Sequence, residues 1–497
     1  MSTSPLPLAL SVSPLSDRRE APQPRPLILD LDGTLVRADM LLETVLALLR
    51  AAPWRLFEIG LWMLRGRAYL KRRLAEETNI EPDVLPFNEE LLAYAADIAA
   101  SGRPVYVATA ADAKVAEKVV RRIAFIRGVI GSDGLRNLKG EAKAEVLAER
   151  FPDGFDYAGD ARADIPIWRR ARNAIVVEAA SSVEHAAASV ATVAKVFPRP
   201  SRIRALVRSM RPHQWAKNAL VFVPLILAGL VSHVDAVYAT TCAFLALGLV
   251  ASSTYLVNDI WDLTDDRSHW SKRNRPLASG RLPLATAIAA VPVGLFAGLA
   301  VAALAGPATV AVVLLYLAIT LLYSFALKRI PILDGFVLAG LFTLRLGAGI
   351  VASGAPPSPW LLVFAMFLFA SLSFAKRHTE VARVIERGGT EVRGRGYKSI
   401  DLPLIMGIGM ATGVAAVLIM VLYIINDAFR QSFYGNTTWL WAFPAILFLF
   451  VCRIWLKCGR SELHDDPVAF AVTDRPSLAL GGALMVCFGL AWSGVFG

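Results

Sequence analysis

The sequence predicts an α/β doubly wound domain with a helical cap, followed by an all-α, polytopic membrane domain of about nine transmembrane helices. In the first third of the chain, short apolar runs alternate with helical stretches, which is the pattern of a parallel sheet covered by helices. From Ala216 onward, apolar stretches long enough to span a bilayer recur up to the carboxyl end. The composition agrees: 55% of the residues are hydrophobic and only 19% are charged, which indicates that part of the chain lies in a membrane.

The positive charge of the chain is concentrated beside its apolar segments. The formal net charge is +11, and an anionic membrane surface and phosphorylated substrates explain this distribution better than nucleic acid does. The soluble part offers no basic face interleaved with aromatic residues, so we do not expect nucleic-acid binding. The cysteines show no metal-type spacing and lie in or beside apolar helices, which predicts inert buried thiols at Cys242, Cys452, Cys458 and Cys487.

The first domain is expected to follow a short leader. Residues 1–24 contain an apolar patch broken by prolines and no basic start, which predicts a disordered leader and not a signal peptide. The domain that follows should therefore stay in the cytoplasm. From Pro26 the run PLILDLDGTL predicts a buried strand, and RPVYVATAAD, FDYAGD and NAIVV predict further strands. Residues 25–180 then form one doubly wound domain, with its site at the carboxyl ends of the strands.

Four motifs occur in order along this domain. The run Asp30-Leu31-Asp32-Gly33-Thr34 follows the first strand, and Thr109 follows the second. A lysine precedes the last motif, Gly159-Asp160 with Asp164. Together these motifs resemble those of the haloacid-dehalogenase-type phosphohydrolases, over residues 25 to about 180.

The resemblance implies a chemical role for each motif. Asp30 would be the nucleophile that forms an aspartyl-phosphate, and Asp32 the general acid and base. Mg²⁺ would be held by Asp160, assisted by Asp164 and Asp30, while Thr109 and the lysine bind the oxygens of the transferring phosphoryl group. Both Lys139 and Lys143 fit the position of that lysine, and the sequence does not separate them.

A helical cap is expected at about residues 38–77, between the first two motifs, where the resembled family inserts one. Its stretch LFEIGLWMLRG is unusually apolar for a cap, yet shorter than the roughly 20 residues of a spanning helix. It is either an ordinary packed cap helix or a surface that docks on the membrane or on the second domain.

The membrane domain should follow a linker and an interfacial basic helix at residues 181–210 and occupy residues 211–497. Lysine and arginine fall in alternate connections between the expected helices, which predicts a multi-pass protein of a bacterial inner membrane with the motif loops and the amino terminus in the cytoplasm and Gly497 outside. The nine spans are expected to begin near Ala216, Ala236, Pro283, Ala308, Ile332, Trp360, Leu404, Trp439 and Leu478.

A dense polar block, NDIWDLTDDRSHWSKRNRP from Asn258, separates two of these spans. At about 100° per residue, a helix places Asp259, Asp262 and Asp266 within an arc of roughly 60°. Carboxylates on one face, with Lys272 and Arg275 behind them, suit Mg²⁺ bound to a pyrophosphate. Acids at a membrane edge are costly, so this block is expected to be functional and not merely a solvated loop.

Two further polar groups lie in later connections. Tyr323 and Lys328 belong to the run YSFALK, which is followed by Asp334 and, eleven positions later, by Arg345. Eleven residues are close to three turns, so the last two share a helix face that we expect to line a polar cavity opposite the first block, unless they only form a salt bridge between helices. A third, basic loop contributes Lys376 and Arg377, although much of its charge could be ordinary positive-inside charge.

These parts together resemble the UbiA superfamily of intramembrane prenyltransferases over residues about 200 to 497. The polar block fits its NDxxDxxxD motif. More narrowly, RPHQWAKN from Arg211, KRNRP, YSFALK, AKRHTE and DDPVAFAVTDR resemble the decaprenyl-phosphate phosphoribosyltransferase branch. The second carboxylate pair of the prenyl-donor branch is missing, since GFVLAG follows Asp334, and this weakens aromatic prenyl transfer.

The resemblance implies transfer of 5-phosphoribose from phosphoribosyl pyrophosphate to a polyprenyl phosphate. Asp259, Asp262 and Asp266 would hold Mg²⁺ on the leaving pyrophosphate, and the fused phosphohydrolase would remove the 5-phosphate. The alternatives are a prenyltransferase that uses a prenyl diphosphate and an aromatic or other acceptor, and a first domain that is only a regulatory module. The expected substrate-binding residues of the membrane domain are Arg211, Lys217, Asn258, Lys272, Arg275, Tyr323, Lys328, Asp334, Arg345, Lys376 and Arg377.

Overall fold

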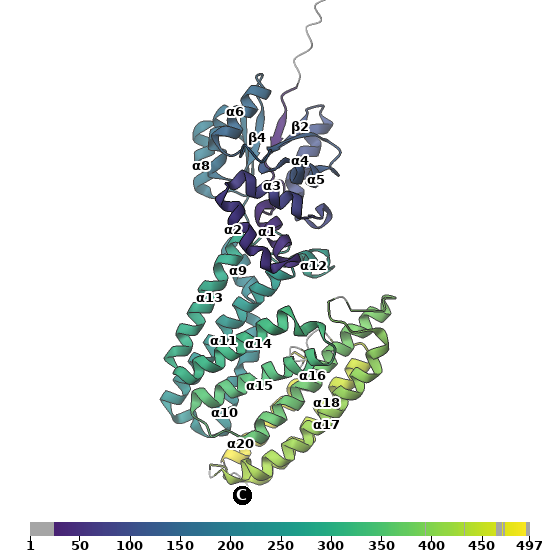
Figure 1. The fold of residues 1–497 in the computed structure, drawn as a ribbon. Coiled ribbons are helices and arrows are strands. Elements are labelled where there is room, and N and C mark those ends of the chain that lie inside the picture. Colours follow the sequence, from purple (N-terminus) through teal and green to yellow (C-terminus); the bar gives the residue numbers. More distant parts are fainter. Residues whose placement is uncertain (1–23, 393, 432, 464–469, 471–472, 494–497) are drawn as a thin grey trace, which may run out of the picture. The chain divides into compact units, whose positions relative to one another are not determined.

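The computed structural model describes residues 24–493 except 393, 432, 464–469 and 471–472 (Figure 1). The expected leader therefore lies almost wholly outside the described residues. The chain divides into two compact units, Met1–Pro200 and Ser201–Gly497.

The first unit is built on a six-stranded parallel sheet in the order β3-β2-β1-β4-β5-β6. Strand β1 pairs with both β2 and β4, so the order in which successive strands are added to the sheet reverses beside β1. The loops after β1 and β4 therefore meet at the carboxyl edge of the sheet. The strands are β1 Leu27–Leu29, β2 Val105–Asp112, β3 Ile126–Ser132, β4 Asp156–Gly159, β5 Asn173–Val177 and β6 Thr192–Phe197.

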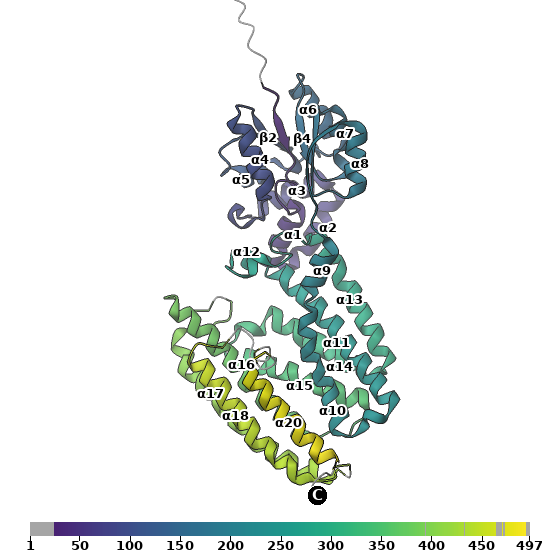
Figure 2. The same ribbon diagram turned by 180° about the vertical axis from the view of Figure 1, so that it is seen from behind.

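Helices cover both faces of this sheet, as Figures 1 and 2 show from opposite sides. One apolar core joins the sheet to α4 (Glu89–Ala100) and α5 (Ala113–Val120). A second core, on the other face, contains α6 (Glu141–Arg150), α7 (Ile165–Arg170) and α8 (Ser181–Val190). Strands that are buried on both faces account for the almost continuous apolar runs in the sequence.

Residues 181–200 do not form the expected linker. They supply α8 and the edge strand β6, which pairs in parallel with β5 from Thr192 to Phe197. The apolar side chains of Val183 and Ala187 on α8 pack into the core of the sheet, which explains why this alanine-rich segment is ordered against the domain. The first unit therefore extends to Pro200 and not to residue 180.

The cap consists of three helices with a small core of their own. They are α1 (Met40–Ala51), α2 (Leu56–Leu64) and α3 (Arg67–Glu77). Asp39 caps α1 by accepting hydrogen bonds from the backbone N–H groups of Leu41 and Leu42, at 2.9 and 3.2 Å. The cap core is closed by Leu48, Ile59, Trp62, Leu70 and Leu74.

The second unit is all helical. Among the described residues, eight helices are long and apolar enough to cross a membrane. They contain α11 (Val234–Trp261), α13 (Leu284–Leu304), α14 (Pro307–Phe325), α15 (Leu333–Ser353), α16 (Pro359–Glu386), α17 (Leu402–Asn426), α18 (Ala442–Gly459) and α20 (Arg475–Ser493).

The first of the nine expected spans, near Ala216, is interrupted and is not one long helix. After α9 (Arg202–Met210), Arg211 adopts a left-handed conformation with φ of 52°, and a 3₁₀ segment η4 (Pro212–Val221) leads into the short helix α10 (Phe222–Leu227). The segment packs closely on α15, because a Cβ added at Gly349 would lie 2.1 Å from the carbonyl oxygen of Val221. The expected span is interrupted by the 3₁₀ geometry of η4 and, after α10, by the left-handed Gly229 with φ of 71°.

Candidate active sites

Three carboxylates meet at the carboxyl edge of the first sheet. Asp30 follows β1, Asp160 follows β4, and Asp164 ends the short 3₁₀ turn Arg162–Asp164; each offers an oxygen within 4.8 Å of the others. The two glycines beside them permit this approach, since a Cβ at Gly33 would lie 2.7 Å from Asp160 Oδ2 and one at Gly159 would lie 2.6 Å from Asp164 Oδ2. Hard oxygen ligands in one place fit a divalent cation such as Mg²⁺.

The electrostatics of the cluster also favour a cation. Burial, followed by the charges of Asp30 and Asp164, raises the pKa of Asp160 to about 8. Burial and the charge of Asp30 likewise raise the pKa of Asp164 to about 6. Such shifts arise because several carboxylates in a poorly solvated place resist carrying their charges together. A bound metal ion would remove that cost.

Lys143 is the lysine of this site. Its Nζ donates to Asp30 Oδ1 at 2.9 Å and to the Tyr157 hydroxyl at 2.9 Å, and that hydroxyl donates to Asp164 Oδ1 at 3.0 Å. Burial disfavours the charge on Lys143, but the carboxylates of Asp30 and Asp164 outweigh it and raise its pKa. Lys139, the other candidate, is exposed.

Asp32 lies where the cap joins the site. Its Oδ1 accepts from the backbone N–H of Met40, the first residue of α1, at 2.7 Å, and its Oδ2 accepts from Thr109 Oγ1 at 3.4 Å. Burial raises the pKa of Asp32 to about 7. The side chain can therefore both give and take a proton near neutral pH.

Sequence reasoning missed Lys71, which reaches this site from the cap. Its Nζ donates to the Ala110 carbonyl at 2.5 Å and to Asn137 Oδ1 at 2.9 Å. Burial lowers the pKa of Lys71, while the charge of Asp32 opposes that shift. The residue stands in the run YLKRRLAEE, where nothing distinguishes it from the neighbouring surface cations.

Replacing Lys143 with methionine is expected to lower phosphate release from a soluble phosphomonoester by about a hundredfold or more, because the donor facing Asp30 is lost. The Lys139→Met variant loses the same charge from an exposed position and should keep nearly full activity. Initial rates of phosphate release from both purified variants measure this. Equal losses in the two variants would contradict the assignment of Lys143.

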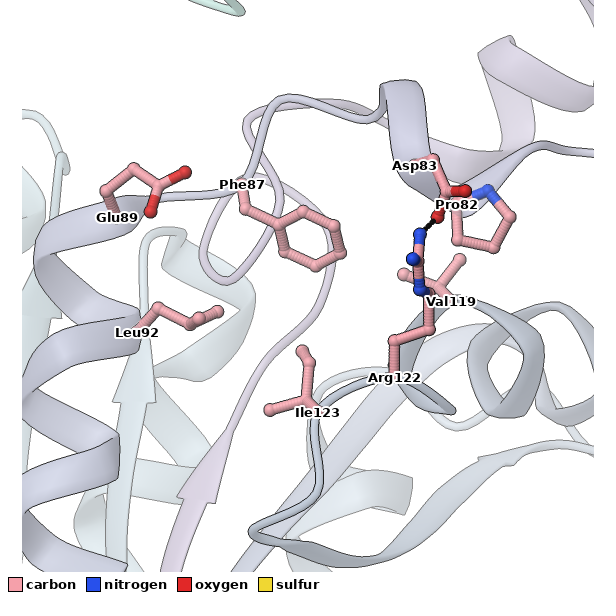
Figure 3. Close-up of a pocket in the computed structure, with 8 residues that line it drawn as sticks. All are labelled: Pro82, Asp83, Phe87, Glu89, Leu92, Val119, Arg122 and Ile123. Carbon is pink, nitrogen blue, oxygen red and sulfur yellow. Dashed lines mark ion pairs between the residues drawn. The ribbon is translucent and has the colours of Figure 1, made fainter.

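The hollow in Figure 3 lies away from these acids. It measures about 250 Å³ and is lined mainly by apolar side chains between α5 and the segment that leads into α4. Arg122 and Asp83 form an ion pair at its edge. Since none of the eight residues drawn there is a candidate site residue, we assign it no part in the chemistry.

The acids of the second unit lie where α11 passes into α12 (Leu263–Ser268). Asp259 and Asp266 are buried, and Asp262 stands at the junction, partly exposed. Helical hydrogen bonds of 2.8 Å continue through the junction, from Asp262 N–H to the carbonyl of Asn258 and from Asp266 N–H to that of Asp262. Asn258 itself is half-buried beside Asp259.

Each of these acids is paired with a cation of the chain. Asp259 pairs with Arg211 at 2.5 Å and with Arg275 at 3.1 Å, and Arg275 also contacts Asp266 at 2.5 Å. Lys272 Nζ lies 3.7 Å from Asp266 Oδ1. The predicted cations behind the acidic face are thus brought against it. Within the described residues, the one group of three acids close enough to share a metal ion is that of the first unit, Asp30, Asp160 and Asp164. Metal binding by Asp259, Asp262 and Asp266 therefore stays a prediction.

Lys328 of the YSFALK connection contacts the first polar block, opposite which the face shared by Asp334 and Arg345 was expected. Lys328 Nζ donates to both carboxylate oxygens of Asp262, at 3.0 and 2.8 Å. Asp334 is instead fully buried in a separate network, where it accepts from Arg377 and, at 2.5 Å, from the Tyr397 hydroxyl. These bonds tie α15 to α16, so the carboxylate of Asp334 is a structural anchor between helices.

The same network holds the other residues expected in this region. Arg377 also donates to the Tyr323 hydroxyl at 3.1 Å and to Glu380 Oε2 at 2.6 Å. Lys376 precedes it on α16 and is half-buried. Arg395 pairs with Glu380 at 3.3 Å and so brings the third loop to the network.

Arg345 is buried and separate from this network. Its guanidinium donates to Asn218 Oδ1 at 2.9 Å, to the Leu341 carbonyl at 2.6 Å and to the Tyr316 hydroxyl at 2.9 Å. All three partners are neutral. The guanidinium also lies 5.1 Å from the Phe342 ring centroid, and Lys217 Nζ lies 5.9 Å from the same ring.

Asn218 and Tyr316 were not expected in a site. Asn218 Nδ2 is buried and has no hydrogen-bond partner within the described structure. The one signal for Asn218 in the sequence is its place in RPHQWAKN, next to Lys217, and Tyr316 is one of several hydroxyl residues within an apolar span. The buried Arg345 guanidinium, whose hydrogen-bond partners are all neutral, and the buried Asn218 Nδ2 form a place that suits an anion.

Comparison with known proteins places the second unit. Residues 219–473 match the model of the UbiA prenyltransferase family. The chain is 39% identical to an uncharacterized protein of Sinorhizobium fredii, y4nM, over 94% of its own length and 91% of that relative, so the similarity extends over both units.

Two relatives with functional names match a little more than half of this chain. The nodulation protein NoeC of Azorhizobium caulinodans is 32% identical over 56% of this chain and 91% of the relative. The decaprenyl-phosphate phosphoribosyltransferase of Mycobacterium tuberculosis is 30% identical over 59% of this chain and 96% of the relative. With its spanning helices and its matched motif region, this chain belongs to the UbiA prenyltransferase family of membrane transferases.

Proposed function

We propose that the membrane unit transfers 5-phosphoribose from phosphoribosyl pyrophosphate to a polyprenyl phosphate, and that the first unit then removes the 5-phosphate to give polyprenyl-phosphoryl-ribose. The observation that carries the first step is the buried guanidinium of Arg345, whose hydrogen-bond partners are all neutral. It provides a second anion site beside the acids that would serve the pyrophosphate. Relatives named decaprenyl-phosphate phosphoribosyltransferase support the same substrates.

The segment η4 connects the two anion sites. Arg211, at its start, contacts Asp259, and Lys217 and Asn218, further along, lie with Arg345. The lipid phosphate would bind to Arg345 and Lys217, with Asn218 Nδ2 as an additional donor. The pyrophosphate would draw Arg211, Arg275, Lys272 and Lys328 from the carboxylates to its own oxygens.

The transfer needs no nucleophile from the protein. An oxygen of the lipid phosphate forms the new bond to C1 of the ribose while the bond from C1 to pyrophosphate breaks. Asp259, Asp262 and Asp266 would hold Mg²⁺, which supplies charge neutralisation of the departing pyrophosphate when it is bound. The cations of the chain bind and orient the two phosphate groups so that the reacting atoms are in line.

The first unit would act as a phosphohydrolase of the haloacid-dehalogenase type. Asp30 would attack the phosphorus of the 5-phosphate to form an aspartyl-phosphate, and Asp32 would protonate the departing hydroxyl and then take a proton from the attacking water. Lys143 and Thr109 would bind phosphoryl oxygens. Asp30, Asp160 and Asp164 fit Mg²⁺ by their spacing and oxygen ligands.

Both sites would face the cytoplasm of a bacterial cell in this proposal. The alternation of basic and neutral connections supports that orientation, with the carboxyl end outside. This topology requires the interrupted segment Arg202–Leu227 to cross the membrane, and the close approach of Val221 to Gly349 on α15 supports such a path.

The test uses phosphoribosyl pyrophosphate labelled with carbon-14 in the ribose and phosphorus-32 in the 5-phosphate. Purified full-length protein, polyprenyl phosphate and Mg²⁺ should give a lipid that first carries both labels and then only carbon-14. Omitting Mg²⁺ should abolish both steps. A pyrophosphate release that requires isoprenyl diphosphate and an aromatic acceptor, with no labelled lipid, would contradict the proposal and favour prenyl transfer.

A further inference from the structure

The cap helix α2 is apolar except for Glu58, which pairs with Arg55, but only one side of the helix is buried. Ile59 and Trp62 face α1 and α3 and close the cap core. The other large side chains of the helix and of the turn before it face outward. We call this surface the cap patch; it consists of Trp54, Leu56, Phe57, Leu61, Met63 and Leu64.

The exposure of the cap patch is unusual in its extent. Phe57 is 82% exposed, Leu64 is 85% exposed, and the least exposed member, Met63, is still 57% exposed. Phe57, Leu61 and Leu64 are spaced four and three residues apart, so they form one continuous stripe along the helix. A soluble surface seldom carries such a contiguous apolar area unless something covers it.

The chemistry of the patch favours a lipid bilayer over a protein surface. None of its side chains except the Trp54 indole carries a hydrogen-bonding group, whereas protein interfaces have a polar rim with regular hydrogen bonds. Two exposed cations, Arg65 and Arg67, follow directly, and neither forms an ion pair with a described residue. An apolar helix bordered by arginines and a tryptophan is the composition of a segment that lies in the headgroup region.

The chain connection between the first unit and the membrane unit is short. Four residues, 198–201, separate strand β6 from α9, which begins the membrane unit. Four extended residues reach at most about 14 Å. Helix α2 has nine residues and so a length of roughly 14 Å, which is too short to span but sufficient to lie flat.

The cap links this surface to the phosphohydrolase site. Helix α1 begins at Met40, whose N–H donates to Asp32, and α3 carries Lys71, whose ammonium donates to the Ala110 carbonyl in β2 and to Asn137 in the loop after β3. We propose that α2 inserts its cap patch into the bilayer and thereby presents the Asp30 site to a phosphomonoester carried on a lipid. The insertion stands on the patch alone; the presentation to substrate rests on the proposed phosphohydrolase function.

Insertion is tested in full-length protein reconstituted into vesicles of phosphatidylcholine and phosphatidylglycerol. Phe57→Cys, in a background with Cys452→Ser and Cys487→Ser, carries an environment-sensitive fluorophore, and Ser182→Cys on α8 is the matched control. Nitroxide-labelled lipid should quench the probe at position 57 and not at 182. Equal quenching at both positions would overturn the insertion. A blue-shifted probe at position 57 that the labelled lipid does not quench would also overturn it, because the probe would then be covered by helices and not by lipid.

Presentation to substrate is tested with Phe57→Asn, Leu61→Asn and Leu64→Asn combined. Hydrolysis of soluble p-nitrophenyl phosphate should be unchanged, whereas kcat/KM for the phosphoribosylated lipid should fall about tenfold or more because the local concentration advantage is lost. Leu135→Asn, which alters an equally exposed side chain outside the cap, should affect neither substrate.

The outcomes separate the two halves of the proposal. Equal losses on both substrates, or no loss on the lipid, would overturn presentation by the cap. If the parent protein hydrolyses neither substrate, the phosphohydrolase function and the presentation fail together, and the quenching experiment still decides the insertion.

Discussion

Replacing Asp259 with asparagine is expected to reduce the formation of labelled lipid by about a thousandfold, since the stabilisation of a departing pyrophosphate by a carboxylate-held Mg²⁺ amounts to several kcal/mol. Asp259 is buried and lies between Arg211 and Arg275, so it is the acid most closely surrounded by cations that serve phosphate. The measurement is the initial rate of transfer of carbon-14 from phosphoribosyl pyrophosphate to polyprenyl phosphate.

Asp265→Asn is the matched control for this change. It removes the same charge from an exposed position beside Asp266 and should leave the rate nearly unchanged. Circular dichroism and the elution profile in detergent should show both variants folded. If Asp259→Asn transfers phosphoribose at the parental rate, the acids of α11 and α12 do not serve the leaving group, and the proposed chemistry of the membrane unit is wrong.

Replacing Asp30 with asparagine is expected to abolish removal of the 5-phosphate and to leave the transfer step intact. The lipid product should then keep phosphorus-32 together with carbon-14, because the amide cannot form an aspartyl-phosphate. The amide also lacks the negative charge that faces Lys143 Nζ at 2.9 Å, so the thermal stability of the variant must be measured alongside its activity.

Asp97→Asn on α4 provides the control, since this exposed acid lies outside the site. It should release phosphorus-32 at the parental rate. A folded Asp30→Asn variant that still releases phosphorus-32 from the lipid would show that the first unit does not perform this step. The regulatory alternative for the first unit would then be preferred.

The general architecture followed from patterns that are local in the sequence. Apolar runs alternating with helices predicted the parallel sheet, and eight of the nine expected spans correspond to long helices. The span expected near Ala216 was wrong because length and hydropathy do not register the 3₁₀ geometry of η4 or the left-handed Gly229 after α10. The edge strand β6 was missed because its outward residues are partly exposed, so the run TVAKVF has the weak apolar character of a linker.

Residues of the candidate sites could be predicted only where the order of strands and helices along the chain determines which residues meet. Asp30 and Asp160 follow strands that are neighbours in the sheet, so their meeting could be foreseen. Lys139 lies in the loop before α6 and Lys143 in the first turn of α6, and only the folded structure shows that Lys143 is the buried one. Asp334 and Arg345 lie on one helix as expected, yet their partners come from other elements: Arg377 on α16 for the first, and Asn218 on η4 for the second.

The double contact of Arg275 with Asp259 and Asp266 bears on how the enzyme tolerates metal depletion. The guanidinium groups of Arg211 and Arg275 together offset the buried negative charges of Asp259 and Asp266, and Lys328 offsets the charge of Asp262. The helices around them therefore need no divalent ion to hold together. Under the proposed mechanism, chelation of Mg²⁺ should stop the transfer reversibly while the helix bundle stays folded. A cell short of magnesium would then keep folded, inactive protein in its membrane.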